Sequence, residues 1–292
     1  MASNHLNEGA IIDERYVVRT EIGIGNMATV YLAEDAIAQR SVAIKVMSER
    51  LVGRPDRERR FFNEDRFQAL LANHPNVVRT YGHGRVSGPD SAPYLAMEHV
   101  AGPSLGLLIT VKKCLEPEHV VHLGLGIANG LRAIHRAGIV HRDVKPDNIL
   151  VAIAQSRETA DEVAKIADFG LAIQLTDAQG AQVSRMTHHL AIPGSSGYIA
   201  PEATSFAVPS PSMDVFGLGM VLLEALTGIN PYAETSREAY LEEIARPEWA
   251  IPSAALAEVA CAPLRALVAE CTQRDPNARP TIDEVIGRLE TI

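Results

Sequence analysis

The alternation of hydrophobic and polar residues predicts strands in roughly the first third of the chain. β-Branched and aromatic residues gather in short runs separated by polar connections, which is typical of strands. The charged stretch 56–72 instead carries hydrophobic residues at roughly helical intervals, so one helix is expected there, with Phe62, Phe67, Leu70 and Leu71 on it. The predicted strands cover 16–22, 29–33, 41–47, 77–81 and 94–100.

After a predicted linker at 101–103 the pattern becomes helical. The apolar run 215–226 contains Glu224 and is shorter than the roughly 20 residues of a membrane-spanning helix, so a buried helix is expected. Thr281 and Glu284 form a capping-box signature for a last helix. Another helix is predicted to end near Gly138, because hydrophobic residues recur before it at three- and four-residue steps: Val120, Leu123, Ile127, Leu131 and Ile134.

The segment 171–199 shows little periodicity and is rich in Gly, Ser, Thr and His. A loop of this length inside a compact domain is usually functional or disordered, and its position favours a functional role. The chain of 292 residues is longer than a single hydrophobic core usually supports. We therefore expect an α+β protein with a mostly β first part and a mostly helical second part.

Composition and charge exclude several classes of function. The net charge of -9 gives little attraction to nucleic acid or to an anionic membrane, so a nonspecific polyanion binder is not expected. The cysteines, Cys114, Cys261 and Cys271, are odd in number and widely spaced, which predicts reduced thiols rather than disulfides or a zinc site. The first residues carry no export signal and Ala2 is not a myristoylation site, so a cytoplasmic protein without a membrane segment is expected.

The candidate chemistry lies in the run H-R-D-V-K-P-D-N at 141–148. Asp143 can accept or orient a hydroxyl proton, Lys145 can neutralise a phosphoryl group, and Asn148 offers a neutral oxygen to a hard cation. Asp168, in D-F-G, can bind Mg²⁺ between phosphate oxygens. Each residue taken singly could serve as a cap or a turn residue, but the combination points to phosphate chemistry.

A second candidate group lies in the β part. Gly23 and Gly25 form a strand-turn-strand tip whose backbone N–H groups could lie over phosphates, although two glycines alone indicate only a tight turn. Lys45 alternates with hydrophobic residues along a strand. The ordinary interpretation is a lysine that faces solvent. The more specific hypothesis is a lysine that faces a phosphate site and is held by Glu64 of the next helix.

These motifs, in this order, resemble the eukaryotic-type protein kinase family, and their texture is similar to its bacterial serine/threonine branch. The resemblance covers roughly 16–289 and includes A-P-E at 200–202, D-V-F-G-L-G at 214–219 and D-P-N-A-R-P at 275–280. It implies the bilobal kinase fold: a small antiparallel β N-lobe with the αC helix and a larger, mostly helical C-lobe. The implied ranges are a leader at 1–15, the N-lobe at 16–100, the C-lobe at 101–292, a catalytic domain at 16–290 and an activation segment at 168–202.

The resemblance also implies roles for single residues. Lys45 would contact the α- and β-phosphates of ATP and pair with Glu64, and Asp143 would be the catalytic base. Lys145 would contact the γ-phosphate. Asn148 and Asp168 would bind Mg²⁺, for which Mn²⁺ is a possible substitute. The remaining ATP-binding residues would be the gatekeeper Met97, the backbone of Glu98 and Val100, and the residues over the base and phosphates: Ile22, Gly23, Gly25, Val30 and Ala43.

Further implied roles concern structure and protein substrates. Glu202 would pair with Arg279, and Asp214 would brace the catalytic-loop backbone. Ser195 stands at the P+1 position, where threonine is commoner in the family, and with Lys145 it resembles the serine/threonine type. Two other departures are Ala28 in place of the third loop glycine and Phe216 where Tyr or Trp is usual.

The same resemblance suggests regulation by phosphorylation. Arg142 precedes the catalytic aspartate, and an arginine there often meets a phosphate on the activation segment. The candidate hydroxyls are Thr176, Ser184 and Thr187, and the distance from A-P-E favours Thr187. Autophosphorylation in trans, with a possible homodimer, is expected.

The predicted function is ATP- and Mg-dependent transfer of the γ-phosphoryl group to Ser or Thr hydroxyls of protein substrates. The first alternative is a pseudokinase-type binding or scaffolding module, which the intact charged residues argue against. The second is a small-molecule phosphotransferase, which the segment from D-F-G to A-P-E argues against, because in the family it docks a polypeptide. No nucleic-acid partner is expected.

Overall fold

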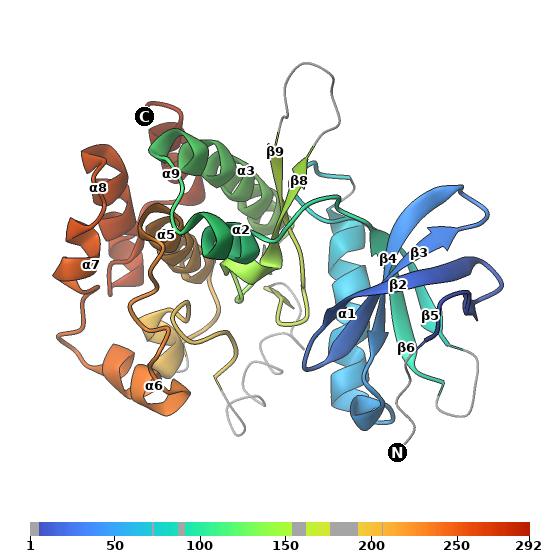
Figure 1. Ribbon diagram of the computed structural model, residues 1–292. Helices are drawn as coiled ribbons and strands as arrows, with labels where there is room; N and C mark the ends of the chain where they lie inside the picture. The colour runs from blue at the N-terminus through green and yellow to red at the C-terminus, as the bar shows by residue number, and fades with distance from the viewer. Residues whose placement is uncertain (1–5, 72, 87–90, 154–161, 176–191, 206) are drawn as a thin grey trace. The chain divides into compact units, whose positions relative to one another are not determined.

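The computed structural model describes residues 6–71, 73–86, 91–153, 162–175, 192–205 and 207–292 (Figure 1). The chain divides into two compact units. Unit 1 comprises Met1–His74 and Val78–Ala101, and unit 2 comprises Pro75–Val77 and Gly102–Ile292. The division near residue 101 falls where the linker is predicted, and each unit is described by itself below.

Unit 1 is built on a six-stranded sheet in which every neighbouring pair is antiparallel. In spatial order its strands are β1 (Ile11–Ile12), β2 (Tyr16–Ile24), β3 (Ala28–Asp35), β4 (Arg40–Met47), β6 (Pro93–Glu98) and β5 (Thr80–Arg85). The predicted strand at 77–81 is displaced to β5. The reason is that Val77 is buried in unit 2, where it forms a parallel bridge with Ile166.

One face of the sheet carries the main core of unit 1, which includes Tyr16, Val18, Tyr31, Val42, Ile44 and Tyr94. Part of the stretch predicted as a leader belongs to this core. Ile12 is buried and its strand pairs with β2, while the Tyr94 hydroxyl donates to Asp13 at 2.8 Å. Among the described residues before Tyr16, Ile11 and Ile12 therefore form an edge strand of the sheet.

Helix α1 (Pro55–Leu70) follows a short 3-10 turn, η1 (Glu49–Leu51), and begins with a proline at its first turn. The predicted apolar face was wrong in part, because Leu70 is exposed and Phe61 is buried instead. The buried stripe runs through Phe61, Glu64 and Phe67 at three-residue steps. A charged residue thus occupies the middle of this stripe, which hides it from a search for hydrophobic positions.

Unit 2 is mostly helical. Its helices are α2 (Leu105–Lys112), α3 (Pro117–Arg136), α5 (Pro211–Thr227), α6 (Arg237–Ala245), α7 (Ser253–Ala257), α8 (Ala262–Cys271) and α9 (Ile282–Leu289). Two antiparallel strand pairs join β7 (Ile139–Val140) to β10 (Ile173–Gln174), and β8 (Ile149–Ile153) to β9 (Glu162–Ile166). The 3-10 turns are η2 (Pro146–Asn148), η3 (Pro201–Ser205) and η4 (Pro276–Ala278).

The helix ends in unit 2 agree with the sequence. Gly138, just beyond α3, has a φ of 71°, a left-handed conformation that glycine adopts without strain. The capping box at Thr281 and Glu284 is present at the start of α9. Helix α5 is buried along most of its length, as the apolar run predicted, and it contacts α3 and α8.

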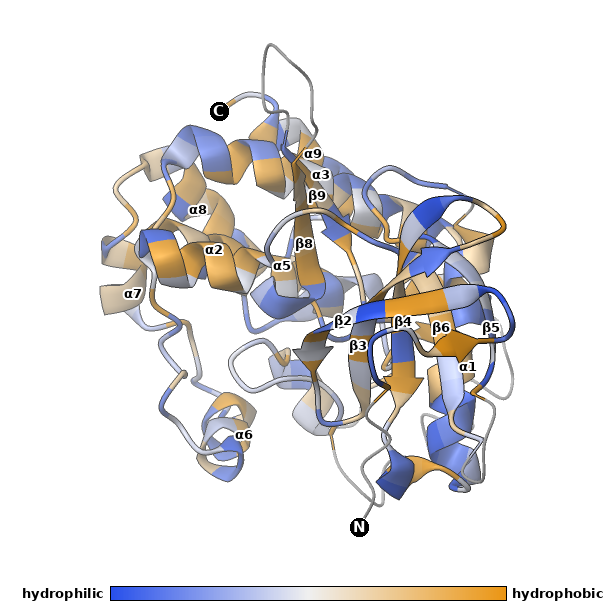
Figure 2. Cartoon of the chain, turned by 45° about the vertical axis from the view of Figure 1, so that its right-hand side comes forward, coloured by the Kyte–Doolittle hydropathy of each residue, from blue (hydrophilic) through white to orange (hydrophobic). Residues whose placement is uncertain are grey.

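Figure 2 colours the chain by hydropathy and so distinguishes hydrophobic from hydrophilic elements. Strand β8, with the sequence Ile-Leu-Val-Ala-Ile, is hydrophobic throughout. Figure 2 also shows that α1 carries hydrophilic residues along much of its length. In the described part of the chain, no helix is both long and apolar enough to cross a membrane.

The pair of Glu202 and Arg279 anchors the start of α5, as expected. Arg279 donates from Nη1 and Nη2 to the two carboxylate oxygens of Glu202, each at 2.7 Å. It also donates to the Ser212 carbonyl at 2.9 Å, and its guanidinium lies 5.0 Å from the centre of the Phe216 ring. Because the Arg279 side chain is 0% exposed, the pair is a buried one.

Replacing Arg279 should therefore be costly. In the variant Arg279→Ala the Glu202 carboxylate loses its buried partner, and breaking such a pair costs about 3–5 kcal/mol. We expect the free energy of unfolding, measured by urea denaturation, to fall by that amount. The control is Arg288→Ala, which removes an exposed pair with Glu270 and should change stability little. Equal losses in the two variants would contradict the buried-pair interpretation.

Candidate active site

The backbone of the loop at 141–148 is held in place by a buried carboxylate. One oxygen of Asp214 accepts the N–H of His141 at 2.8 Å, and the other accepts the N–H of Arg142 at 2.7 Å. His135 of α3 adds a third contact, from Nε2 to Asp214 at 2.9 Å. Burial raises the pKa of Asp214, but the hydrogen bond from His135 and those from the loop outweigh it, so the pKa lies below its ordinary value. The bracing role expected of Asp214 is thus present.

This bracing matters because the loop backbone is unusual. Arg142 has a φ of 66°, which is uncommon for a residue other than glycine. Its side chain donates from Nε to the Leu171 carbonyl at 2.8 Å. The two hydrogen bonds to Asp214 offset the cost of this conformation, which lies directly before Asp143.

Asp143 is 7% exposed and both of its oxygens are engaged. Oδ1 accepts the hydroxyl of Ser195 at 2.9 Å and the Ser195 N–H at 3.0 Å. Oδ2 accepts from the Asn148 amide at 2.9 Å and lies 3.2 Å from Lys145 Nζ. Lys145 also donates to the Ser195 hydroxyl at 2.6 Å. Four predicted site residues of unit 2 are therefore in direct contact, and one of the contacts is a hydroxyl on the carboxylate.

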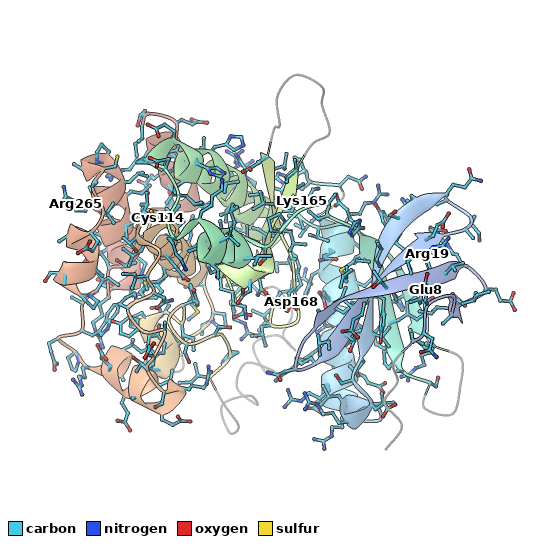
Figure 3. The ribbon with its side chains drawn as sticks, viewed as in Figure 1. Glu8, Arg19, Cys114, Lys165, Asp168 and Arg265 are labelled. Carbon is cyan, nitrogen blue, oxygen red and sulfur yellow. The ribbon has the colours of Figure 1, made fainter. Side chains whose placement is uncertain are left out.

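The hairpin β8–β9 brings the two predicted metal ligands to one end. Ile149 pairs with Ile166, and the Ala167 N–H donates to the Asn148 carbonyl at 2.8 Å, so Asp168 emerges beside Asn148. Figure 3 labels Asp168 where the chain leaves β9.

This pair of residues suits a hard cation. The Asn148 side chain donates to Asp143 from its amide nitrogen, which leaves its oxygen as the ligand atom. Asp168 supplies a carboxylate, and oxygen ligands are those that Mg²⁺ prefers. No cluster of three or more His, Cys, Asp or Glu side chains that could hold a metal occurs among the described residues, so any ion would take other ligands from its nucleotide or water.

Unit 1 contains the second predicted group. Lys45 Nζ donates to the two carboxylate oxygens of Glu64 at 3.0 and 2.7 Å. The side chains are 15% and 2% exposed, so the expected pair is present and largely shielded from water. The strand register places Lys45 opposite Val30 and Ala43 opposite Met97.

The other residues predicted to bind adenine lie near the end of β2, at the end of β6 or just beyond β6. Ile22, on β2, is 47% exposed, and Glu98 is the last residue of β6. The Glu98 N–H already donates to the Arg79 carbonyl at 2.8 Å, whereas Val100 is buried beyond the strand. The sheet thus brings these residues to one unit; their contact with ATP stays a prediction.

The tip between β2 and β3 is tied to the chain after β4. Met27 accepts the N–H of Ser48 at 2.9 Å, and Arg50 donates to the Asn26 carbonyl. A Cβ at Gly23 would meet no atom within 4 Å, and neither Gly23 nor Gly25 has a positive φ. The fold therefore gives no local steric reason for glycine at Gly23, and its contact with a phosphate stays a prediction.

The structure does not describe the predicted phosphorylation sites, and it shows a partly buried charged residue whose role was not predicted. Thr176, Ser184 and Thr187, the predicted phosphorylation sites, lie outside the described residues. Glu224 was noted only as an interruption of an apolar run. It accepts the Tyr198 hydroxyl, and burial, with a smaller effect of the Asp147 charge, raises its pKa. A charged residue in a buried helix was the available signal, since such a group needs a partner.

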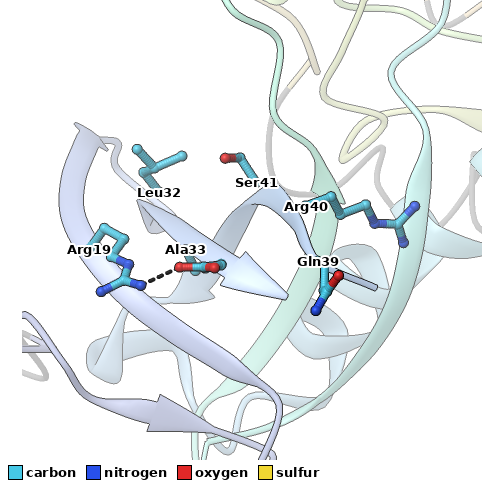
Figure 4. Close-up of a pocket in the computed structure, with 7 residues that line it drawn as sticks. Arg19, Leu32, Ala33, Gln39, Arg40 and Ser41 are labelled. Carbon is cyan, nitrogen blue, oxygen red and sulfur yellow. Dashed lines mark hydrogen bonds and ion pairs between the residues drawn. The ribbon is translucent and has the colours of Figure 1, made fainter. Parts of the chain in front are cut away.

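A shallow hollow on the sheet of unit 1 does not coincide with any predicted site. Arg19 at its rim pairs with Glu34 (Figure 4). The Arg40 guanidinium lies over the Tyr81 ring, 3.4 Å from its centre. These charges are engaged within the unit. The lining residues are Arg19, Leu32, Ala33, Glu34, Gln39, Arg40 and Ser41, none of which was predicted to act in catalysis.

Comparison with known proteins identifies the class that this geometry defines. The sequence matches the protein kinase domain family over residues 16–288. A probable serine/threonine-protein kinase of Clostridium perfringens is 33% identical over 97% of this chain, which is 39% of the relative. The serine/threonine-protein kinases PknL and PknB of Mycobacterium tuberculosis are 35% and 31% identical over 78% and 92% of this chain, and 53% and 41% of their own length.

The chain therefore belongs to the protein kinase domain family, and its relatives place it with bacterial serine/threonine kinases. The bilobal kinase fold and the family predicted from the sequence are confirmed. Membership implies the use of ATP, a divalent metal ion and protein substrates. The chain spans about 39–53% of the length of the curated relatives it matches.

The brace at Asp214 predicts a stability that depends on pH. In Asp214→Asn one of the loop N–H groups would face an amide NH₂, so we expect a loss of about 2–4 kcal/mol in the free energy of unfolding at pH 7. The folded pKa of Asp214 is lowered, so its contribution is present above the unfolded value of about 4 and is lost as the pH falls through the folded pKa.

The difference between wild type and Asp214→Asn should accordingly shrink toward low pH, as measured by denaturation at several pH values. Asp283→Asn serves as the control, because that carboxylate is 62% exposed and lies 3.7 Å from its arginine partners. A difference that stays constant with pH, or one that the control reproduces, would contradict the assigned brace.

Proposed function

We propose that this kinase domain transfers the γ-phosphoryl group of ATP, with Mg²⁺, to Ser or Thr hydroxyls of protein substrates. The observation that carries the proposal is the contact of the Ser195 hydroxyl with Asp143 Oδ1 at 2.9 Å. It supports a carboxylate placed to accept a hydroxyl proton, with the Lys145 ammonium 2.6 Å from the same oxygen of Ser195. A substrate hydroxyl would take a similar place on Asp143.

The residues have distinct roles in this proposal. Asp143 orients the acceptor hydroxyl and receives its proton, since a positioned base near the hydroxyl raises its nucleophilicity. Lys145 and Lys45 neutralise phosphate charge, and Glu64 fixes the position of Lys45. A divalent ion held by Asn148 and Asp168 would neutralise further phosphate charge. ATP would be bound by the strand residues of unit 1 named in the sequence analysis.

The activity and the partners of the whole protein are part of the proposal, because the chain spans only part of its relatives. Mg²⁺ rather than Mn²⁺ is proposed as the physiological ion. Activation by autophosphorylation, a homodimer that phosphorylates itself in trans, and a cytoplasmic location also remain proposals.

Replacing the base should separate chemistry from binding. Asp143→Asn should lower the rate of phosphate transfer to a generic basic protein by roughly 10²–10⁴-fold, because the amide cannot take the proton. The affinity for ATP, measured by calorimetry with Mg²⁺, should stay near that of wild type. Asp283→Asn, which alters an exposed carboxylate in unit 2, is the control and should keep full activity. Undiminished transfer by Asp143→Asn would show that Asp143 is not the catalytic base.

Incubation with Mg-ATP should add phosphate between Thr176 and Ser196, with Thr187 as the favoured position. Mass spectrometry of wild type before and after incubation tests this, and Asp143→Asn provides the background. If the reaction runs in trans, its initial rate per molecule should rise with protein concentration. Phosphate absent from this range in an active preparation would refute the regulatory proposal and leave the transfer activity intact.

A further inference from the structure

The segment 192–199, called the docking segment here, is held from two sides within unit 2. On one side, the Ser195 N–H and hydroxyl both donate to Asp143 Oδ1, and Lys145 donates to the same hydroxyl. This side ties the segment to the catalytic loop. These contacts fix the segment at Ser195 only, so its two ends need other partners.

Helix α6 provides the second anchor. Arg237, its first residue, donates from Nη1 to the Gly194 carbonyl at 2.8 Å and from Nη2 to the Ile192 carbonyl. One turn further, the Tyr240 hydroxyl donates to the Ile199 carbonyl at 2.8 Å. The three acceptors are backbone carbonyls at both ends of the docking segment. Helix α6 therefore fixes the backbone path of the segment and not the position of a single side chain.

The sequence explains why both side chains meet the segment. The Ser236 hydroxyl caps α6 by accepting the N–H of Ala239 at 3.2 Å, which fixes where the helix begins. Arg237 and Tyr240 are then three residues apart and share one helix face. Tyr240 is 0% exposed, so the face is firmly docked.

The geometry of the docking segment suits an arginine fork. Gly194 has a φ of 111°, and a Cβ there would lie 3.0 Å from Ile199 Cγ1 and 3.2 Å from the Arg142 carbonyl oxygen. Glycine is therefore required at this turn, and the turn directs the Gly194 carbonyl toward α6. A guanidinium can donate to two carbonyls at once from a planar fork, whereas an ammonium acts as a single point charge.

We propose that Arg237 is a positioning residue for protein substrates: by holding the Ile192 and Gly194 carbonyls it keeps Ser195 on Asp143 and keeps the docking segment shaped to receive a polypeptide. The inference rests on the proposed kinase function. The Arg237 guanidinium donates to the Ile192 and Gly194 carbonyls and not to the Ser195 hydroxyl or to Asp143, so it acts through the segment. The KM for ATP should not depend on Arg237.

The test compares Arg237→Ala, Arg237→Lys and a control, Arg265→Ala, in steady-state transfer to a basic protein. Arg265 lies on α8, where Figure 3 labels it, and the described residues provide no hydrogen bond or ion pair for its side chain. We expect Arg237→Ala to raise KM for the protein about tenfold, since two charge-assisted hydrogen bonds are lost. KM for ATP should stay within about twofold, Arg237→Lys should recover part of the loss, and the control should match wild type.

A second measurement works without activity. Hydrogen exchange of the amides at 194–199 should be faster in Arg237→Ala than in wild type or Arg265→Ala. If wild type transfers no phosphate, the proposed function fails, whereas the exchange result still decides whether Arg237 holds the segment. Unchanged exchange, or equal changes in KM for protein and for ATP, would overturn the proposal.

Should Arg237→Ala fail to fold, Tyr240→Phe provides the same test with the packing kept. It removes only the hydroxyl that donates to Ile199, so we expect a smaller rise in KM for the protein, about threefold, with KM for ATP unchanged. No change in KM for the protein together with unchanged exchange near Ile199 would overturn the proposal equally.

Discussion

The catalytic loop depends on one buried carboxylate. Asp214 lies in a helix that is buried along most of its length, and its two oxygens accept backbone N–H groups from consecutive residues of the loop. A buried carboxylate is costly unless such donors surround it. In return it fixes a left-handed residue, Arg142, directly before Asp143. Rigid placement of the base thus follows from a polar group inside a largely buried helix of unit 2.

Around this brace the site is assembled by backbone atoms as much as by side chains. Ser195 reaches Asp143 across 52 residues of sequence, and α6 reaches the docking segment across more than 40. In each case one partner is a main-chain N–H or carbonyl group. Such contacts resist substitution at the residue that supplies the main-chain group, because nearly every residue carries that group, and they concentrate the specific requirement on the side chain that it meets.

The sequence allowed prediction of whatever is local or belongs to an ordered motif. The cap at Gly138, the capping box at Thr281 and the pair of Lys45 with Glu64 could all be expected from spacing or resemblance. The placement of Val77 could not be predicted, because hydrophobic character does not indicate which unit buries a residue. The buried face of α1 could not be predicted either, because a charged residue can lie in a buried stripe. The roles of His135 and Arg237 escaped for a related reason: their partners are distant in sequence and leave no periodic trace.

The position of Glu64 has a practical consequence for the study of this kinase domain. Glu64 stands in the buried stripe of α1 between Phe61 and Phe67, and its carboxylate is 2% exposed. Removing the Lys45 charge would leave that carboxylate without its lysine partner inside the core of unit 1. A variant made by changing Lys45 should therefore lose stability, whatever its effect on phosphate transfer. A lowered activity measured in cells could then report a lowered protein level as readily as a lost reaction.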